Sequence, residues 1–89
     1  MSDGDDLWPV SVSPLVAEAL ADPVLPAELF SKICALTVAI AENPWLEGSS
    51  QAAQGGDWRT ALIPDGRGIV EYLVKKEEQQ VVLTRIFPF

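Results

Sequence analysis

Three consecutive β-strands are predicted by the stretch GDWRTALIPDGRGIVEYLVKKEEQQVVLTRIFPF, residues 56–89. The sequence PDGRG, residues 64–68, is a strong turn signal between two apolar runs. The polar run KKEEQQ, residues 75–80, turns the chain back a second time. This part of the chain therefore predicts an antiparallel sheet of three strands.

The register of these strands decides which side chains share a face. A five-residue loop at the first turn pairs Ile63 with Ile69, and a three-residue loop at the second turn pairs Lys76 with Gln80. A slip of one residue would exchange the two faces. The uncharged face, assigned to the helices, carries Trp58, Thr60, Leu62, Val70, Tyr72, Val74, Val82, Thr84 and Ile86. The other face, expected to be open to water, carries Arg59, Ala61, Ile63, Ile69, Glu71, Leu73, Leu83, Arg85 and Phe87.

A short strand and two helices are predicted ahead of this sheet. The alternation in LWPVSVS, residues 7–13, is typical of a strand. Ser13 is a good N-cap residue and Pro14 suits the first helical position. An apolar stripe at helical spacing predicts a second helix, and its members are Leu29, Ile33, Leu36 and Ile40.

The composition indicates one small domain without metal or cofactor. The chain has 89 residues, an apolar fraction of 48%, a single cysteine and no histidine. We therefore expect no disulfide, no zinc site and no cofactor. No apolar run reaches the length of a membrane span, so a cytoplasmic protein is expected. Residues 1–6 are expected to form a disordered acidic terminus, and residues 7–89 a single domain.

The charge is unevenly distributed along the chain. Residues 1–50 hold eight acids and one base, whereas residues 51–89 hold five of each. The net charge of −7 repels a polyanion, because neutralising phosphates supplies most of the affinity of nucleic-acid binders. A nucleic-acid function would therefore depend on a local basic patch in the second half.

Arg59, Glu71 and Arg85 are predicted to lie side by side across the three strands. One interpretation is a cross-strand charge cluster of modest stabilising effect, about 0.2–1 kcal/mol per pair. The other is a basic site or a partner surface on an apolar sheet. A sheet face this apolar is unusual on a monomer, which favours a covering partner.

Three segments resemble the RelE/ParE superfamily of bacterial toxins. They are SPLVAEAL (residues 13–20), AIAENPW (residues 39–45) and GIVEYLVKKEEQQVVLTRI (residues 68–86). The resemblance covers about residues 7–89 through the order and spacing of these features. It implies an α+β fold, with a short N-terminal strand and two helices packed on one face of a three- to four-stranded antiparallel sheet.

The resemblance also implies a function. RelE-type members cut messenger RNA on the ribosome, ParE-type members act on DNA gyrase, and an antitoxin neutralises both. By this resemblance the candidates for catalysis are Arg59, Arg67, Glu71 and Arg85, and such an enzyme would be a metal-independent endoribonuclease. Ile69 stands where the family often has an arginine, and Arg67 would have to substitute for it from the turn. The chain also stops at Phe89, near where another arginine is expected.

These departures favour binding over cleavage. The leading hypothesis is a toxin-like component of a toxin–antitoxin module, with a cognate antitoxin as partner. The alternatives are a RelE-type endoribonuclease, and a non-toxic interaction protein or homodimer with the same fold. The predicted partner surface comprises Arg59, Leu73, Leu83, Arg85, Phe87 and Phe89. Pro88 is expected to end the strand pairing and free the tail, whereas a tail folded back on its sheet would bury both phenylalanines.

Overall fold

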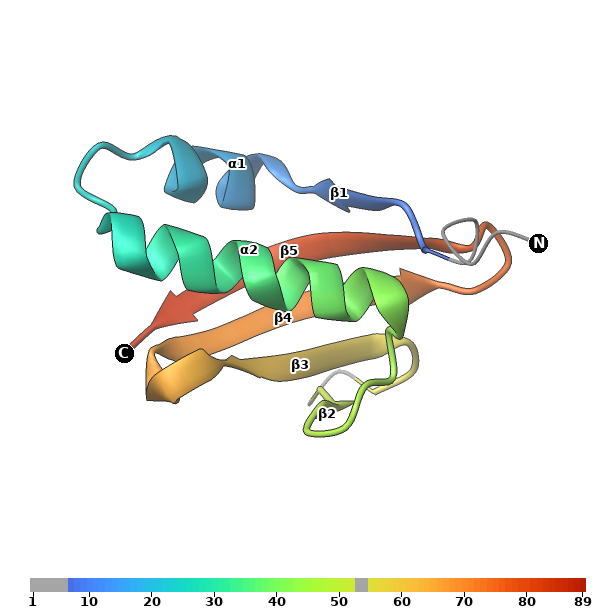
Figure 1. The fold of residues 1–89 in the computed structure, drawn as a ribbon. Helices are drawn as coiled ribbons and strands as arrows, with labels where there is room; N and C mark the ends of the chain where they lie inside the picture. The colour runs from blue at the N-terminus through green and yellow to red at the C-terminus, as the bar shows by residue number, and fades with distance from the viewer. Residues whose placement is uncertain (1–6, 53–54) are drawn as a thin grey trace.

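The computed structural model describes residues 7–52 and 55–89, and the expected acidic terminus, residues 1–6, lies outside them. Figure 1 shows two helices on one side of a twisted sheet. The elements in chain order are β1 (Val10–Val12), α1 (Pro14–Ala21), α2 (Ala27–Glu42), β2 (Ser50–Gln51), β3 (Trp58–Ile63), the 3₁₀ turn η2 (Pro64–Gly66), β4 (Gly68–Lys75) and β5 (Gln80–Pro88).

The sheet is larger than the sequence predicted. Its order over the described residues is β1-β5-β4-β3-β2, and its pairs are antiparallel except for β1, which runs parallel to β5. The predicted α+β arrangement, with both helices on one face, is confirmed. The additional strand β2 has two residues in a glycine- and serine-rich segment, where no alternating pattern marked it.

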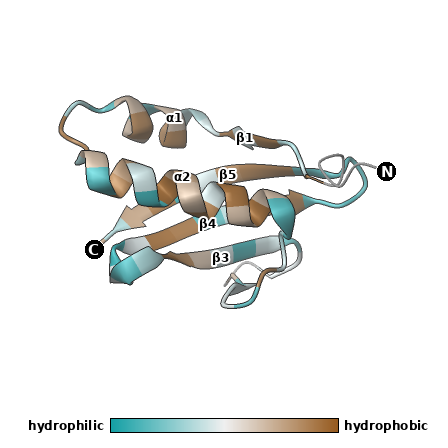
Figure 2. Cartoon of the chain, viewed as in Figure 1, coloured by the Kyte–Doolittle hydropathy of each residue, from teal (hydrophilic) through white to brown (hydrophobic). Residues whose placement is uncertain are grey.

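The second helix lies on the predicted face of the sheet. Its stripe of Leu29, Ile33, Leu36 and Ile40 is buried in one cluster with Val70, Tyr72 and Val74. Brown, apolar segments of β4 and β5 lie beneath this helix in Figure 2. The Tyr72 hydroxyl donates a hydrogen bond to the Pro44 carbonyl oxygen at 2.6 Å. The centre of the sheet is thereby attached to the end of α2.

Ser13 joins the start of α1 to β5. Its hydroxyl oxygen accepts from the Val16 amide at 3.3 Å, as an N-cap residue does, and its hydroxyl donates to the Thr84 carbonyl oxygen at 3.0 Å. The Ser13 amide also donates to the Leu83 carbonyl at 2.9 Å. The predicted cap thus fixes the position of the helix on the sheet as well as its beginning.

The first hairpin has a shorter loop than predicted, and the faces assigned to β3 were wrong. Ile63 pairs with Gly68 rather than with Ile69. Asp65 and Gly66 both adopt left-handed backbone conformations, φ 64° and 66°, and this allows four residues to close the turn. The shift of one residue turns Arg59, Ala61 and Ile63 toward the helices, and turns Trp58, Thr60 and Leu62 to the open side.

The loop of the second hairpin is one residue longer than predicted. Lys75, not Lys76, pairs with Gln80, and Gln79 takes the left-handed conformation (φ 54°) that a glycine would favour. Val81 and Leu83 consequently face the helices, and Val82 faces outward. A bulge beside Thr84 then restores the predicted pairing of Val70 with Ile86. Leu83 is therefore core, at 1% exposure, and its assignment to the partner surface was wrong.

Candidate functional site

The sheet face opposite the helices, called here the open face, carries one polar row between two apolar rows. Residues paired directly across antiparallel strands lie on the same face, so the register defines each row. The polar row consists of Ser50, Thr60, Glu71 and Arg85. One apolar row consists of Leu62, Ile69 and Phe87, and the other of Trp58, Leu73 and Val82.

Glu71 and Arg85 occupy the centre of the open face. Glu71 is 9% exposed, and the Thr84 hydroxyl lies 3.0 Å from its carbonyl oxygen and 3.1 Å from its carboxylate. The bulge places Thr84 here, so it orients the carboxylate from the neighbouring strand. Arg85 is exposed, and among the described residues no carboxylate approaches its guanidinium within 4.0 Å. A ligand could therefore reach this cation.

The apolar rows are accessible near the first hairpin. Leu62 is 61% exposed and Phe87 is 43% exposed, while Ile69 between them is half-buried. A hollow of about 210 Å³ adjoins Leu62 at the β2 edge. It is lined by Gly48, Ser50, Thr60, Ala61, Leu62 and Ile69. An apolar side chain of a partner could enter this hollow beside the polar row.

Two of the four predicted catalytic candidates lie away from the open face. Arg59 points to the helix side of β3, where its guanidinium donates to the Ser49 hydroxyl oxygen at 2.7 Å. Arg67 follows the turn and forms an ion pair with Glu28 of α2 at 3.2 Å. The structure therefore brings together Glu71 and Arg85 alone of the predicted four.

The first turn is held against α2 by a network of charges. Lys32 donates to the Asp65 carboxylate at 2.6 Å and lies 4.0 Å from Glu28. This hydrogen bond and the charge of Lys32 lower the pKa of Asp65, and the charge of Arg67 acts in the same direction. The cations of this network stabilise the turn and are engaged with acids of the same chain.

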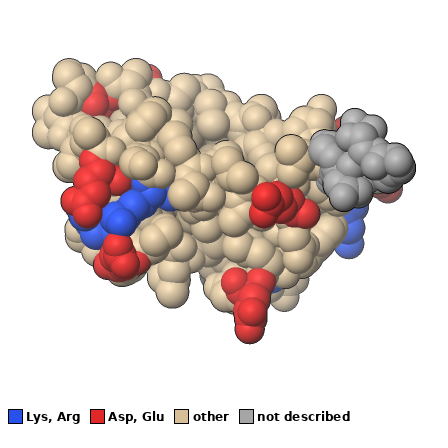
Figure 3. Space-filling model, viewed as in Figure 1, with Lys and Arg blue, Asp and Glu red and all other residues tan. Residues whose placement is uncertain are grey.

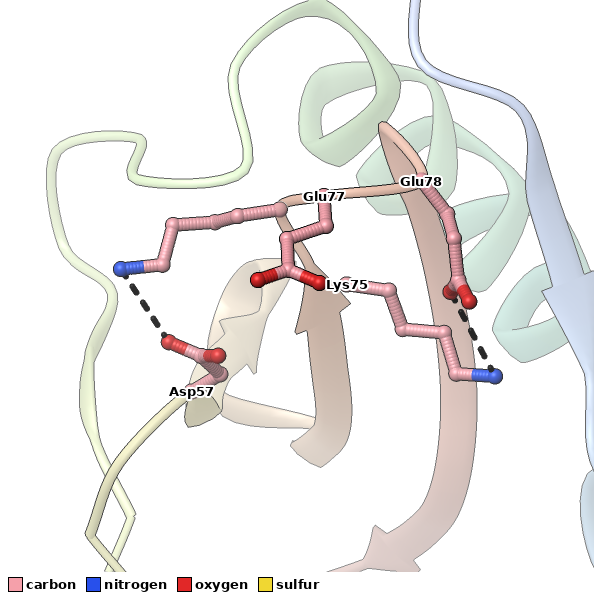
Figure 4. Close-up of a pocket in the computed structure, with 5 residues that line it drawn as sticks. Asp57, Lys75, Glu77 and Glu78 are labelled. Carbon is pink, nitrogen blue, oxygen red and sulfur yellow. Dashed lines mark ion pairs between the residues drawn. The ribbon is translucent and has the colours of Figure 1, made fainter.

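The remaining two lysines are also paired with acids. Lys76 lies 3.4 Å from Asp57, and Lys75 lies 3.9 Å from Glu78. Figure 4 shows Lys75 extending toward Glu78 at the second turn. Together with Glu77 these residues line a hollow of about 240 Å³ at the second turn. With three acids around two paired lysines, this hollow does not offer a free positive charge to a phosphate.

The tail is paired with the sheet, so the prediction that Pro88 frees it was wrong. Phe87 pairs with Ile69 and Pro88 with Gly68, and the Phe89 amide donates to the Arg67 carbonyl oxygen at 3.0 Å. The two rings are nevertheless 43% and 76% exposed. The alternative, in which a folded-back tail buries both rings, is therefore also wrong.

The described parts of the chain contain neither a group of metal ligands nor a helix able to span a membrane. Within residues 7–52 and 55–89, no three His, Cys, Asp or Glu side chains are grouped as metal ligands would be. In the same residues, neither helix has the length and apolar character needed to cross a membrane.

Comparison with known proteins gives one informative likeness. No family model matches the sequence, and no curated protein matches it significantly. Among solved structures, the chain is similar to the crystal structure of the isolated E. coli RelE toxin, with a TM-score of 0.76. The alignment covers 91% of this chain and 83% of that one, at 12% sequence identity. The likeness shows the RelE-like fold that the sequence resemblance implied.

Proposed function

From the RelE-like fold we propose that this chain is the toxin-like component of a bacterial toxin–antitoxin module and acts by binding protein through its open face. The fold supports the choice of module, and the open face supports the mode of action. The proposed partner is a cognate antitoxin, with the ribosome and DNA gyrase as alternative cellular targets. Such a protein would work in the cytoplasm.

The observation that carries this proposal is the arrangement of two apolar rows around Glu71 and Arg85. The buried centres of interfaces are apolar and enriched in aromatic side chains and arginine, and a few residues supply most of the binding energy. Leu62 and Phe87 are large apolar side chains exposed on the same row. Covering them would remove apolar surface from water and place Arg85 within reach of a partner carboxylate.

The charges argue against nucleic acid as the main ligand. The net charge is −7, and every lysine is in an ion pair. Arg67 is paired with Glu28 and Arg59 is bound to Ser49. Affinity for a phosphate backbone grows with the number of cations that neutralise it, and the open face presents Arg85 beside an acid.

The test uses the product of the open reading frame next to the gene that encodes this chain. We expect the two proteins to copurify, and Phe87→Ser and Leu62→Ser each to weaken the complex at least tenfold in titration calorimetry. Val24→Ser is the matched control, because Val24 is 82% exposed in the connection between the helices. A complex that the Leu62 and Phe87 variants leave intact would contradict the open-face assignment.

A second candidate function is RelE-type cleavage of messenger RNA on the ribosome. The observation in its favour is the exposed guanidinium of Arg85 beside a carboxylate that Thr84 orients. Arg59 and Arg67, the other cations proposed for such a site, are bound elsewhere. A homodimer through the open face is the third reading, and sedimentation equilibrium of the purified chain distinguishes it from a monomer.

A further inference from the structure

We propose that the outer surface of α2 is a second docking surface and that it accepts a basic amphipathic helix of a partner protein. This surface, called here the α2 stripe, lies on the opposite side of the molecule from the open face. It consists of the exposed residues Phe30, Cys34 and Val38 of α2, followed by Trp45 after the end of the helix. The proposal does not depend on the function proposed above.

The α2 stripe is continuous along the helix. Phe30, Cys34 and Val38 follow one another at intervals of four residues, which places them one above the other. Phe30 is 42% exposed and Val38 is 56% exposed. The buried stripe that contains Ile33 and Ile40 faces the sheet, so α2 is apolar on two sides. A helix that packs on one sheet alone would ordinarily present polar residues to water.

Two tryptophans extend the stripe past the end of α2. The Trp8 amide donates to the Ala41 carbonyl oxygen at 2.8 Å, which fixes the segment before β1 against the end of the helix. The rings of Trp8 and Trp45 meet edge to face, with centroids 5.4 Å apart and planes at 84°. Trp45 still exposes 43% of its surface. A preoriented, half-exposed tryptophan is a typical anchor of a protein interface.

The charges beside the stripe are acidic. Glu42 lies one turn beyond Val38, and Glu47 is two residues after Trp45. Among the described residues, neither of these two carboxylates has a cation within 4.0 Å. In Figure 3, broad uncharged areas over the helices separate groups of acids, and the main basic area lies directly against acidic side chains.

This combination selects the occupant. An apolar stripe edged by unpaired carboxylates is complementary to a helix with apolar side chains on one face and Lys or Arg beside them. A second copy of this chain would instead bring uncompensated acids against one another, in a protein whose net charge is −7. The part of α2 from Phe30 to the flanking Glu42 is about 18 Å long, a little over three helical turns.

The proposal is tested with a pair of synthetic helical peptides on the full chain. Both peptides are four turns long and carry leucines at positions i, i+3, i+4 and i+7; one has lysines and the other glutamates beside the leucines. Titration calorimetry at low salt should show the lysine peptide binding at least tenfold more tightly than the glutamate peptide. Added salt should reduce this difference, because the charges are exposed.

Three variants locate the binding site, with circular dichroism to confirm that each is folded. Val38→Glu should weaken binding of the lysine peptide at least tenfold. Glu42→Lys should reduce the difference in affinity between the lysine peptide and the glutamate peptide. Leu62→Glu, on the open face, should leave the affinity for the lysine peptide within about twofold. The proposal is overturned if the two peptides bind equally or not at all, or if Leu62→Glu abolishes binding and Val38→Glu does not. A dimer in sedimentation equilibrium that Val38→Glu dissociates would identify a second copy as the occupant and would also overturn it.

Discussion

Gly68 allows β4 to begin in direct contact with the end of β5. Its φ of +148° is a conformation that residues with a side chain rarely adopt. A Cβ at this position would lie 2.4 Å from the Phe87 carbonyl oxygen and 2.9 Å from the Pro88 Cα. Because both neighbours are main-chain atoms, a rotation of a side chain cannot relieve the overlap.

Gly68→Ala should therefore lower the free energy of unfolding by about 1–3 kcal/mol, measured by urea denaturation. Gly66→Ala is the matched control. Gly66 also has a positive φ, +66°, but an added Cβ would meet no atom within 4 Å. Gly66→Ala should lower the free energy of unfolding only by the cost of placing alanine in the left-handed conformation, about 1 kcal/mol. Equal losses in the two variants would show that the contact with β5 contributes nothing.

Asp65 makes the stability of the first turn dependent on pH. Lys32 lowers the pKa of Asp65 in the folded protein below its ordinary value of 3.8. The ionised carboxylate therefore stabilises the fold above pH 3.8, and this contribution is lost as the pH falls through the lower folded pKa. The stabilising contribution of Asp65 should therefore disappear at pH values below 3.8.

Asp65→Asn should abolish this part of the pH dependence, and asparagine tolerates the left-handed backbone that the position requires. Thermal unfolding of both proteins should show the native chain more stable at pH 6, with the difference closing between pH 4 and pH 2 at low salt. A difference that persists undiminished at pH 2 would mean that the ion pair with Lys32 is not its source.

At the scale of elements, α2 buries four side chains in the core (Leu29, Ile33, Leu36 and Ile40), and α1 buries Val16. Ile33 is 1% exposed in the core, whereas Val38, five residues later on the same helix, is 56% exposed. Ile33→Ala should cost about 2–5 kcal/mol in urea unfolding. Val38→Ala, a truncation on the outer surface of the same helix, should change stability by less than about 0.5 kcal/mol. Similar losses would contradict the orientation of the helix.

The helices and the faces of β4 were predictable from the sequence, whereas the faces of β3 and of the first half of β5 were not, for a physical reason. A helical stripe occupies a broad arc, so the position of α2 survives small errors in its ends. A strand has a period of two, so one residue more or less in a turn exchanges its faces. Asp65-Gly66 was the available sign of a tighter first turn, since both residue types tolerate left-handed backbone.

The residues of β5 itself contain no sequence signal for the bulge at Thr84, in contrast to Asp65-Gly66 in the first turn. The bulge coincides with hydrogen bonds from the Ser13 hydroxyl to the Thr84 carbonyl and from the Ser13 amide to the Leu83 carbonyl. Its partner is therefore a cap residue at the far end of the sequence, which local alternation cannot reveal. Arg85 and Phe87 were placed on the correct face because this bulge cancels the error in the preceding loop.

At the scale of the whole molecule, the predicted site survives in part. Glu71, Leu73, Arg85 and Phe87 share the open face as expected, and Trp58, Leu62 and Val82 join them in place of Arg59 and Leu83. The open face thus gains three apolar side chains and loses the positive charge of Arg59. The revised face is thus more suitable for a protein partner, and less suitable for RNA, than the sequence alone indicated.

Ribosome-dependent cleavage of messenger RNA should accordingly be weak or absent. A phosphoryl-transfer site needs cations around the developing charge, and the open face presents Arg85 next to Glu71. Primer extension on ribosome-bound message measures the activity, with the E. coli RelE toxin as positive control. Robust cleavage that Arg85→Ala removes and Arg67→Ala leaves unchanged would establish the second candidate function instead.

The parallel pairing of β1 with β5 has a consequence for the order of folding during synthesis. Ser13 and its partner Thr84 are separated by 71 positions in the chain. The ribosome therefore completes β1, both helices, β3 and β4 before the strand that lies between β1 and β4 exists. Until β5 emerges, the nascent chain exposes strand edges and an uncovered core, the surfaces that chaperones bind. Closure of the sheet is thus deferred until β5 has been made.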